Sequence, residues 1–361
     1  MVNNSNEDLI MNAKLILIPI FLIGLCMVQS DEEFPNRIDT GSGNYNKPNP
    51  KYPGSTVTTK PETLPRPRNI NLEYGDIRYN YKASTCGYRN KNGVLSNIKN
   101  VSNNEAEFGE FPWMVRISEK IIKKGKVVNS FKCGGSLIAP TVVLTGAHCV
   151  KSLQALNYLV RAGEWESNSD DEPFPHQERQ VVEIIMHENF DDGDFLENNI
   201  ALLFLETEFD AAPHIKTVCL PPANTNFDMS RCIASGWGRD KFGSKIHRKI
   251  MKKIDLRVVP KGKCQNALRK TRLGEYFELH SSFICAGGEI GKDTCTGDGG
   301  SPLVCPMANN PDRYYQVGIV SWGIGCGDTN VPGVYASVPH LRSWIDKQLA
   351  DKDIDANSFT P

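Results

Sequence analysis

The cysteine pattern constrains the fold of this chain more than any other feature of the sequence. There are 11 cysteines in 361 residues. One of them, Cys26, lies in an apolar segment, residues 15–27, which follows Lys14 and is typical of a secretory signal peptide. Loss of Cys26 with this leader leaves an even number of cysteines in a chain that we expect to be secreted. In that compartment cysteines form disulfides, so we expect neither free thiols nor zinc ligands.

The charge balance and the hydropathy exclude two classes of partner. The chain has 41 basic and 42 acidic residues, a formal net charge of −1, whereas nucleic-acid-binding domains that depend on bulk charge are strongly basic. The apolar leader is too short for a transmembrane helix, and no second apolar stretch is long enough to cross a bilayer. Two alternatives stay open for the leader: translation starts at Met1 or at Met11, and the segment is cleaved or is retained as a signal anchor.

The chain divides into four parts by composition. We interpret residues 1–30 as the signal peptide. Residues 31–85 lack cysteine and are rich in Pro and Asn, so we predict that they form a disordered tether. Residues 86–349 contain all the remaining cysteines and are predicted to be the folded domain, and residues 350–361 form a C-terminal tail.

The secondary-structure signals of the predicted domain are mostly those of strands. Runs such as VVLTGAHCV, NIALLFL and YYQVGIVSWG are short, apolar and bounded by Gly, Pro, Asn and Asp, which is typical of an all-β sandwich or barrel. One helix is predicted near the end, where Leu341, Ile345 and Leu349 follow Pro339 at i, i+4, i+8 spacing.

Several short motifs carry a resemblance to a known family. Three of them, TGAHC at 145–149, NNIALL at 198–203 and DTCTGDGGSPLVC at 293–305, stand in this order along the chain. The others are CGGSLI at 133–138, SGWG at 235–238, ICAGG at 284–288, SWGIGC at 321–326 and PGVY at 332–335. From about Cys86 to Leu349 the chain therefore resembles the chymotrypsin-like serine proteases. The resemblance implies two six-stranded β-barrels with the active site between them.

The resemblance also implies that the catalytic residues are incomplete. The chemistry needs a hydroxyl nucleophile, an imidazole base and a carboxylate that orients the imidazole. His148 matches the base, but Asn199 stands where the family has the carboxylate, and Gly299 stands where it has the serine of GDSGGP. In a serine protease, an amide in place of the carboxylate costs about four orders of magnitude in rate. Loss of the nucleophile costs about six orders of magnitude in subtilisin.

Two rescues of catalysis are conceivable and both are disfavoured. Ser301 is two residues from Gly299, and misplacement of a reacting group by about 1 Å already costs a hundredfold in rate. Glu197 and Asp194 are near Asn199 in sequence, and we interpret them as loop charges rather than as a replacement carboxylate. We therefore expect no enzyme activity.

The resemblance implies that a specificity pocket survives. Asp293 matches the acid at the base of the pocket in trypsin-like members, and Gly323 and Gly333 match the small residues that keep it open. Such a pocket accepts a Lys or Arg side chain. The alternative, which we favour at this stage, is inherited shape without a ligand. The backbone N–H groups of Gly297 and Gly299 could still form an oxyanion hole, unless Ser301 needs a positive φ and forces the turn to rearrange.

The resemblance implies that activation by cleavage has been lost. Active members are cut before an Ile-Val-Gly-Gly-like sequence, and the new ammonium pairs with the aspartate that matches Asp298. Here the matching segment, residues 99–103, has neither the apolar start nor the glycines. Asn100-Val101-Ser102 is instead an N-glycosylation sequon, so Asn100 is a predicted glycosylation site and Asp298 is left without its usual ammonium partner.

The family's disulfides use every cysteine that follows the leader. The pairs implied by the resemblance are Cys86–Cys219, Cys133–Cys149, Cys232–Cys305, Cys264–Cys285 and Cys295–Cys326. The bridge between Cys133 and Cys149 closes a short loop around His148.

A narrower resemblance points to one branch of the family. Residues 161–190, residues 264–295 and the string GDGGSPLVCP resemble the non-catalytic clip-domain serine protease homologues of arthropods, which include prophenoloxidase-activating factors without proteolytic activity. The resemblance implies a secreted regulatory cofactor or adaptor in an extracellular innate-immune cascade of the melanisation type. Its partners would be a protease, a zymogen or a prophenoloxidase-like protein. One departure is plain, because residues 31–85 lack the six cysteines of a clip domain.

Two other functions compete with this one. The first is an active serine endopeptidase that uses the displaced Ser301. The second is a purely structural extracellular binding module that uses the tether and a basic run. That run consists of Lys245, His247, Arg248, Lys249, Lys252 and Lys253. We favour an exposed strand face over a polyanion site for it.

No cofactor is required by this interpretation, but one cation site is suggested. Glu164 falls in the loop where several family members bind Ca²⁺ through oxygen ligands. Further acidic residues follow it at Asp170, Asp171, Glu172 and Glu178. The family's second carboxylate has no clear match, so a solvated acidic loop is the favoured alternative.

Overall fold

The computed structural model describes residues 86–95, 104–151, 154–167, 169, 172–239, 249–295 and 297–361. The predicted leader, the predicted tether and the sequon at Asn100 lie outside these residues, and so does half of the basic run. Among the described residues, no helix combines the length and the apolar character that a membrane span requires.

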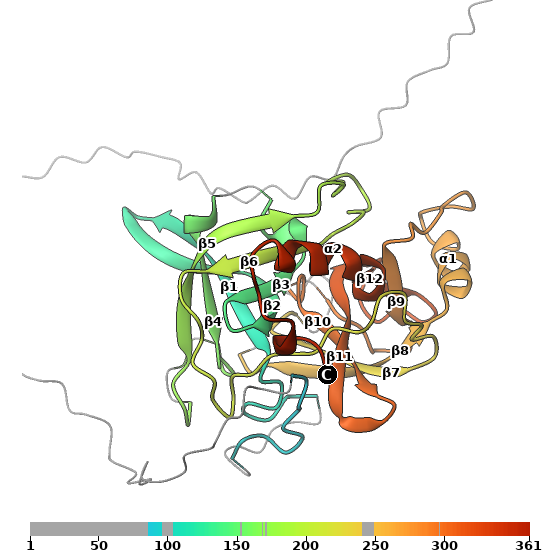
Figure 1. Cartoon of the computed structure of the whole chain (residues 1–361). Helices are drawn as coiled ribbons and strands as arrows, with labels where there is room; N and C mark the ends of the chain where they lie inside the picture. The colour runs from blue at the N-terminus through green and yellow to red at the C-terminus, as the bar shows by residue number, and fades with distance from the viewer. Residues whose placement is uncertain are drawn as a thin grey trace, which may run out of the picture. The chain divides into compact units, whose positions relative to one another are not determined.

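Six strands close into the first barrel in the order β1-β2-β3-β6-β5-β4, each antiparallel to its neighbours (Figure 1). Their bounds are β1 Met114–Lys123, β2 Lys126–Ala139, β3 Val142–Thr145, β4 Tyr158–Ala162, β5 Gln177–Met186 and β6 Ala201–Leu205. Strand β4 alternates buried and half-buried residues, as a strand with one face on the core must.

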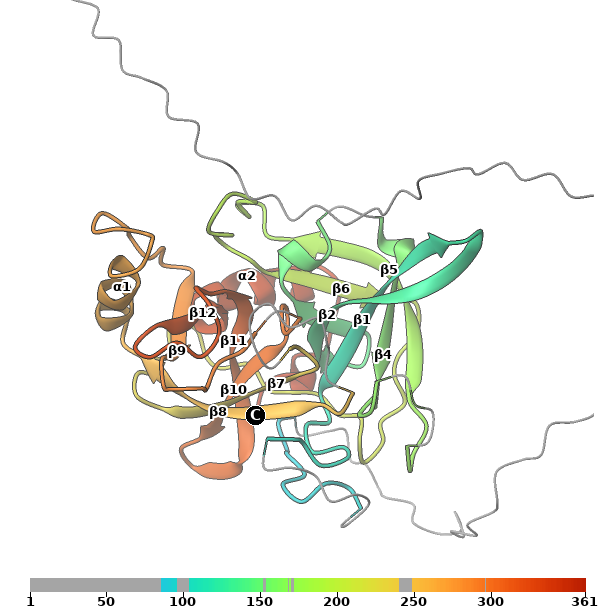
Figure 2. The same cartoon turned by 180° about the vertical axis from the view of Figure 1, so that it is seen from behind.

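Six more strands close into the second barrel in the order β10-β11-β12-β9-β8-β7. Their bounds are β7 Arg231–Gly236, β8 Lys252–Val259, β9 Phe283–Gly287, β10 Pro302–Met307, β11 Asn310–Trp322 and β12 Pro332–Ser337. Figures 1 and 2 show the two barrels side by side from opposite directions. The predicted fold of two six-stranded barrels is therefore confirmed.

Strand β6 explains why one run of the sequence is apolar without alternation. All five of its residues are buried. Ala201, Leu203 and Leu205 point into the core of the first barrel, whereas Leu202 and Phe204 belong to a core that also contains residues of the second barrel, such as Ile319. A strand with apolar partners on both faces reads as a continuous apolar run. Asn199 lies two residues before this strand and is thereby held between His148 and Ser321.

In the described part of the chain, two α-helices and three short 3₁₀ helices connect or follow the strands. The predicted C-terminal helix is α2, Val338–Ala350, whose buried Leu341, Ile345 and Leu349 pack on the core between the barrels. The second α-helix, α1 Lys261–Arg269, was not predicted, because only Cys264 and Leu268 of its nine residues are buried. The 3₁₀ helices are η1 Ala147–Cys149, η2 Ala155–Asn157 and η3 Ala356–Ser358.

Five disulfides join the pairs of cysteines that the resemblance implies. Cys133–Cys149 ties strand β2 to η1, the turn that carries His148. Cys295–Cys326 ties together two loops of the second barrel. Both bridges flank the cavity that is described next.

Candidate functional site

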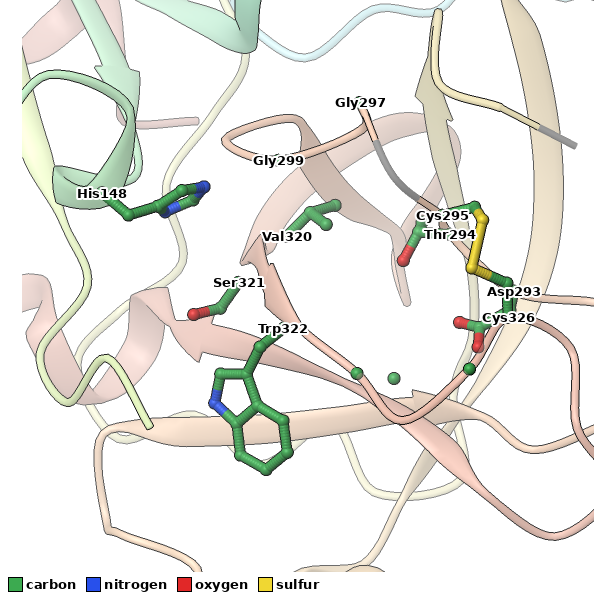
Figure 3. A pocket seen from close by; sticks show the side chains of 13 residues that line it. His148, Asp293, Thr294, Cys295, Gly297, Gly299, Val320, Ser321, Trp322 and Cys326 are labelled. Carbon is green, nitrogen blue, oxygen red and sulfur yellow. A yellow bond between two sulfur atoms is a disulfide. The ribbon is translucent and has the colours of Figure 1, made fainter. Parts of the chain in front are cut away.

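A cavity of about 330 Å³ lies between the two barrels. The first barrel contributes His148, and the second barrel contributes Asp293, Gly299, Trp322 and other residues of the loops that follow β9 and β11. In Figure 3, His148 and Asp293 lie at opposite sides of the cavity, with Gly299 between them. The site residues predicted from the three main motifs are thus brought together.

His148 and Asn199 are joined by a network that fixes the tautomer of the imidazole. Asn199 Oδ1 accepts a hydrogen bond from the backbone N–H of His148 at 3.0 Å. Asn199 Nδ2 lies 2.6 Å from Ser321 Oγ and 2.8 Å from His148 Nδ1. Oδ1 also lies 3.1 Å from Nδ1, but a proton on Nδ1 would then face the shorter contact with the amide NH₂. The shorter contact favours Nδ1 as the acceptor and Nε2 as the protonated nitrogen of the neutral ring.

The electrostatic surroundings of His148 favour the neutral ring. Burial lowers the pKa of His148 below its usual value. The positive charges of Lys151 and Lys132 lower the pKa further. A neutral ring with its proton on Nε2 offers a donor, not a base, to the side where Gly299 lies.

Gly299 leaves no hydroxyl beside the imidazole, and the ring occupies part of the space that a side chain would need. A Cβ atom added at Gly299 would lie 2.8 Å from His148 Nε2. Such a distance requires the ring to move. The cavity therefore presents an N–H group next to bare backbone.

Ser301 points away from this cavity. Its side chain is buried against Gly134, where any added side chain would overlap Ser301 Oγ, and it is 1% exposed. Its Oγ has no hydrogen-bond partner among the described residues. The positive φ angles of the turn fall on Gly297 and Gly300, at 95° and 78°, so the serine fits and the turn need not rearrange. This geometry opposes a catalytic role for Ser301.

Asp293 forms the base of the cavity, with one oxygen unused. Its Oδ2 accepts a hydrogen bond from the N–H of Gly327 at 3.2 Å, whereas the buried Oδ1 has no partner within the described part of the chain. A Cβ atom at Gly333 would lie 2.8 Å from Oδ1, so glycine at this position leaves room for the carboxylate. Gly323 also lines the cavity. The three predicted pocket residues therefore lie together.

The model of the family described as Trypsin matches residues 100–345. The chain belongs to the trypsin family. Strand order and disulfides agree with this membership, and so does the cavity between the barrels.

Relatives in the family narrow the resemblance. The chain is 49% identical over 282 residues to phenoloxidase-activating factor 2 of Galleria mellonella, covering 76% of this chain and 92% of that protein. It is 36% identical over 309 residues to inactive CLIP domain-containing serine protease A28 of Anopheles gambiae, covering 84% of this chain and 76% of that protein. Protease A8 of the same species, also named inactive, is 37% identical over 282 residues, with 78% and 73% covered. The predicted resemblance to non-catalytic clip-domain homologues is confirmed.

Burial makes the pocket acid of this trypsin-family chain a source of instability at neutral pH. Desolvation raises the pKa of Asp293 from 3.8 to about 6. Between these values the folded chain binds more protons than the unfolded chain, so the free energy of unfolding falls as pH rises through this window. We expect Asp293→Asn to raise the free energy of unfolding at pH 7.5 by up to about 3 kcal/mol. It should leave stability near pH 3 unchanged.

Urea denaturation of the wild type and Asp293→Asn at both pH values measures this difference. Glu289→Gln serves as the control, because its carboxylate is near the surface and is not part of the cavity lining. Equal stability of the wild type and Asp293→Asn at pH 7.5 would contradict the raised pKa.

The predicted cation site does not fit a calcium ion. The side chain of Glu164 is fully buried, and its two oxygens are ion-paired with Arg116 at 3.2 Å and with Arg161 at 2.9 Å. Glu172 accepts hydrogen bonds from backbone N–H groups, and Glu178 pairs with Arg161. Two guanidinium groups thus neutralise the carboxylate that a cation would use. The favoured alternative of a solvated loop is also wrong for Glu164, while Asp170 and Asp171 lie outside the described residues.

Two of the three described lysines of the basic run are engaged in ion pairs, whereas the third, Lys249, is exposed. Lys252 pairs with Asp298 at 2.9 Å and Lys253 pairs with the buried Glu110 at 2.8 Å. The interpretation of these two lysines as an exposed strand face is therefore wrong. Neither ion pair could be predicted from the sequence, because each acidic residue is far from its lysine along the chain.

One further cluster resembles a metal site by distance alone. Cys133, His148 and Cys149 have ligand-type atoms within 4.8 Å of one another. The two cysteines form a disulfide, so neither offers the thiolate that a metal needs.

Proposed function

We propose that this chain is a secreted, non-catalytic regulator that acts by binding protein partners in an extracellular protease cascade of the innate-immune, melanisation type. The observation that carries the proposal is the bare backbone of Gly299 beside His148 Nε2. The names of the relatives support it, since one is a phenoloxidase-activating factor and two are inactive proteases. Five disulfides support an extracellular location.

The absence of catalysis follows from the substitution of two residues of the triad. Gly299 is the nucleophile position and Asn199 the carboxylate position of the degenerate triad. Without a hydroxyl no acyl-enzyme can form. Without a carboxylate the imidazole keeps its proton on Nε2, where the base function is needed. Either defect alone is sufficient to stop peptide hydrolysis.

The preserved pocket is the natural place for a basic side chain of a partner. Asp293 Oδ1 is buried and unpaired within the described residues, and a guanidinium or ammonium group would satisfy it. This recognition needs no nucleophile. A protease homologue can therefore keep its ligand while losing its reaction.

We expect a fluorophosphonate probe to leave the folded chain unlabelled, because Gly299 has no hydroxyl and Ser301 Oγ is buried. The treated and repurified chain should still raise phenoloxidase activity in a mixture of a prophenoloxidase and its activating protease. Mass spectrometry of the intact chain measures labelling, and oxidation of a catechol substrate measures the activity produced.

Active trypsin treated in parallel controls for probe reactivity. Stoichiometric labelling of Ser301, with loss of the regulatory effect, would instead support a displaced endopeptidase site. An unlabelled chain without any effect on phenoloxidase formation would contradict the regulatory function and favour a purely structural module.

A further inference from the structure

Three donors converge on the carboxylate of Asp298 beneath the cavity. Its Oδ1 accepts from the N–H of Gly238 at 2.8 Å, and its Oδ2 accepts from the N–H of Cys295 at 3.0 Å. The third donor is the ammonium group of Lys252, 2.9 Å from Oδ2. Asp298 is 1% exposed, so this is a buried carboxylate with a complete set of partners.

Lys252 supplies a positive charge that Asp298 needs. A buried carboxylate without a cation is costly, and removal of one partner of a buried pair is strongly destabilising. The lysine is held in place by strand β8, where Lys252 pairs with Gly236 of β7. Its ammonium group also donates to the carbonyl of Arg239 at 2.9 Å. The cation therefore comes from the side chain of a strand residue.

Asp298 connects this ion pair to the wall of the cavity. Its backbone N–H donates to the carbonyl of Cys295, and its carbonyl accepts from the N–H of Ser301. The turn fixed in this way carries Gly297 and Gly299, which line the same cavity as Asp293. Displacement of Asp298 would move this wall. Lys252 therefore affects the shape of the cavity through Asp298 and the turn that contains it.

We propose that Lys252 is a positioning residue that keeps the Asp293 pocket open in the intact chain, so that the pocket accepts a guanidinium or amidinium group without cleavage of the chain. This inference rests on the pocket of the proposed function, and it assigns to an internal lysine the part that a new amino terminus plays in active members. The ligand class is a basic side chain. The pocket is then a permanent binding site, not one that is created by proteolysis.

The test measures benzamidine binding to the intact, full-length chain by titration calorimetry. We expect Lys252→Met to weaken binding by about tenfold or more, because the competent form of the pocket becomes a minor population. Lys252→Arg keeps the charge and should restore binding. Lys253→Met is the control, since it removes the neighbouring lysine from another buried acid, Glu110, which is not part of the cavity lining and keeps Arg89 as a partner.

Each outcome decides the proposal. Selective weakening in Lys252→Met with rescue by Lys252→Arg supports it. Equal binding by the wild type and Lys252→Met would overturn it, and so would equal losses in Lys252→Met and Lys253→Met, which indicate general destabilisation. If Lys252→Met does not fold, Lys252→Gln takes its place, with thermal unfolding recorded for each variant. Failure of the intact wild type to bind, with binding gained after cleavage, also overturns the proposal, whereas the phenoloxidase assay tests the regulatory function separately.

Discussion

Restoring only the missing hydroxyl, by Gly299→Ser, is expected to leave peptide hydrolysis at least about four orders of magnitude below that of an intact protease of this family. Asn199 would still hold the proton of His148 on Nε2, so the ring could not accept the proton of the new hydroxyl. The new Cβ would also lie 2.8 Å from Nε2 and push the ring from its place. A nucleophile without an oriented base gains little from proximity.

The double variant Gly299→Ser with Asn199→Asp separates these causes. A carboxylate at position 199 would accept from Nδ1 and free Nε2 to act as the base, so the double variant should exceed the single variant in rate. Gly299→Ala is the control, because it adds the Cβ without the hydroxyl. Hydrolysis of an arginyl amide substrate measures the rates. Strong activity of Gly299→Ser alone would contradict the conclusion that Asn199 prevents His148 from acting as the base.

The structure indicates that no further substitution, beyond those at positions 199 and 299, is needed to test the triad. Ser301 has no positive φ and packs against Gly134, so a return to glycine at position 301 is not needed to shape the turn. The pairing of Lys252 with Asp298 likewise removes the need for an apolar amino terminus at this aspartate. The double variant therefore contains every change that a complete triad requires.

Much of the fold and the site could be predicted because the relevant signals are local. Short motifs identify the turn of His148, the segment of Asn199 and the loop of Gly299, and each motif is placed by the strand next to it. Strand β6, for example, has a continuous apolar run because both its faces meet a core. The disulfide pairs followed from the resemblance and not from spacing, since ten cysteines can be joined in many ways.

The pairs of charges could not be predicted, for a physical reason. Glu164 is paired with Arg116, and Asp298 with Lys252, and only the closed barrels bring the members of each pair together. The sequence shows a carboxylate in a calcium-type loop or a lysine in a basic run, and both patterns are typical of solvated surfaces. The partner that changes their meaning lies elsewhere in the chain. The tautomer of His148 depends on such a partner too, because Ser321 helps to orient the amide of Asn199.

The pocket gives the second large expected effect. Asp293→Ala should weaken benzamidine binding at pH 7.5 by about 2–5 kcal/mol, the usual cost of removing one member of a buried charge pair. This corresponds to roughly 30-fold to several thousand-fold in affinity. The amidinium would otherwise meet Asp293 Oδ1, which has no competing donor in the described residues. Glu289→Ala is the control, because it removes a carboxylate that pairs with Arg231 outside the cavity.

The pH dependence of the same binding distinguishes a specific contact from a general attraction. Burial raises the pKa of Asp293 to about 6, so affinity should be constant above this pH and fall as the carboxyl group is protonated below it. In Asp293→Ala this pH dependence should vanish, while Glu289→Ala should keep it. If affinity stays level down to pH 4.5, the amidinium is not held by Asp293. Binding that depends on Asp293 makes a Lys or Arg side chain the feature to seek in a partner protein, and a pocket that binds nothing places partner recognition on the outer surfaces of the barrels.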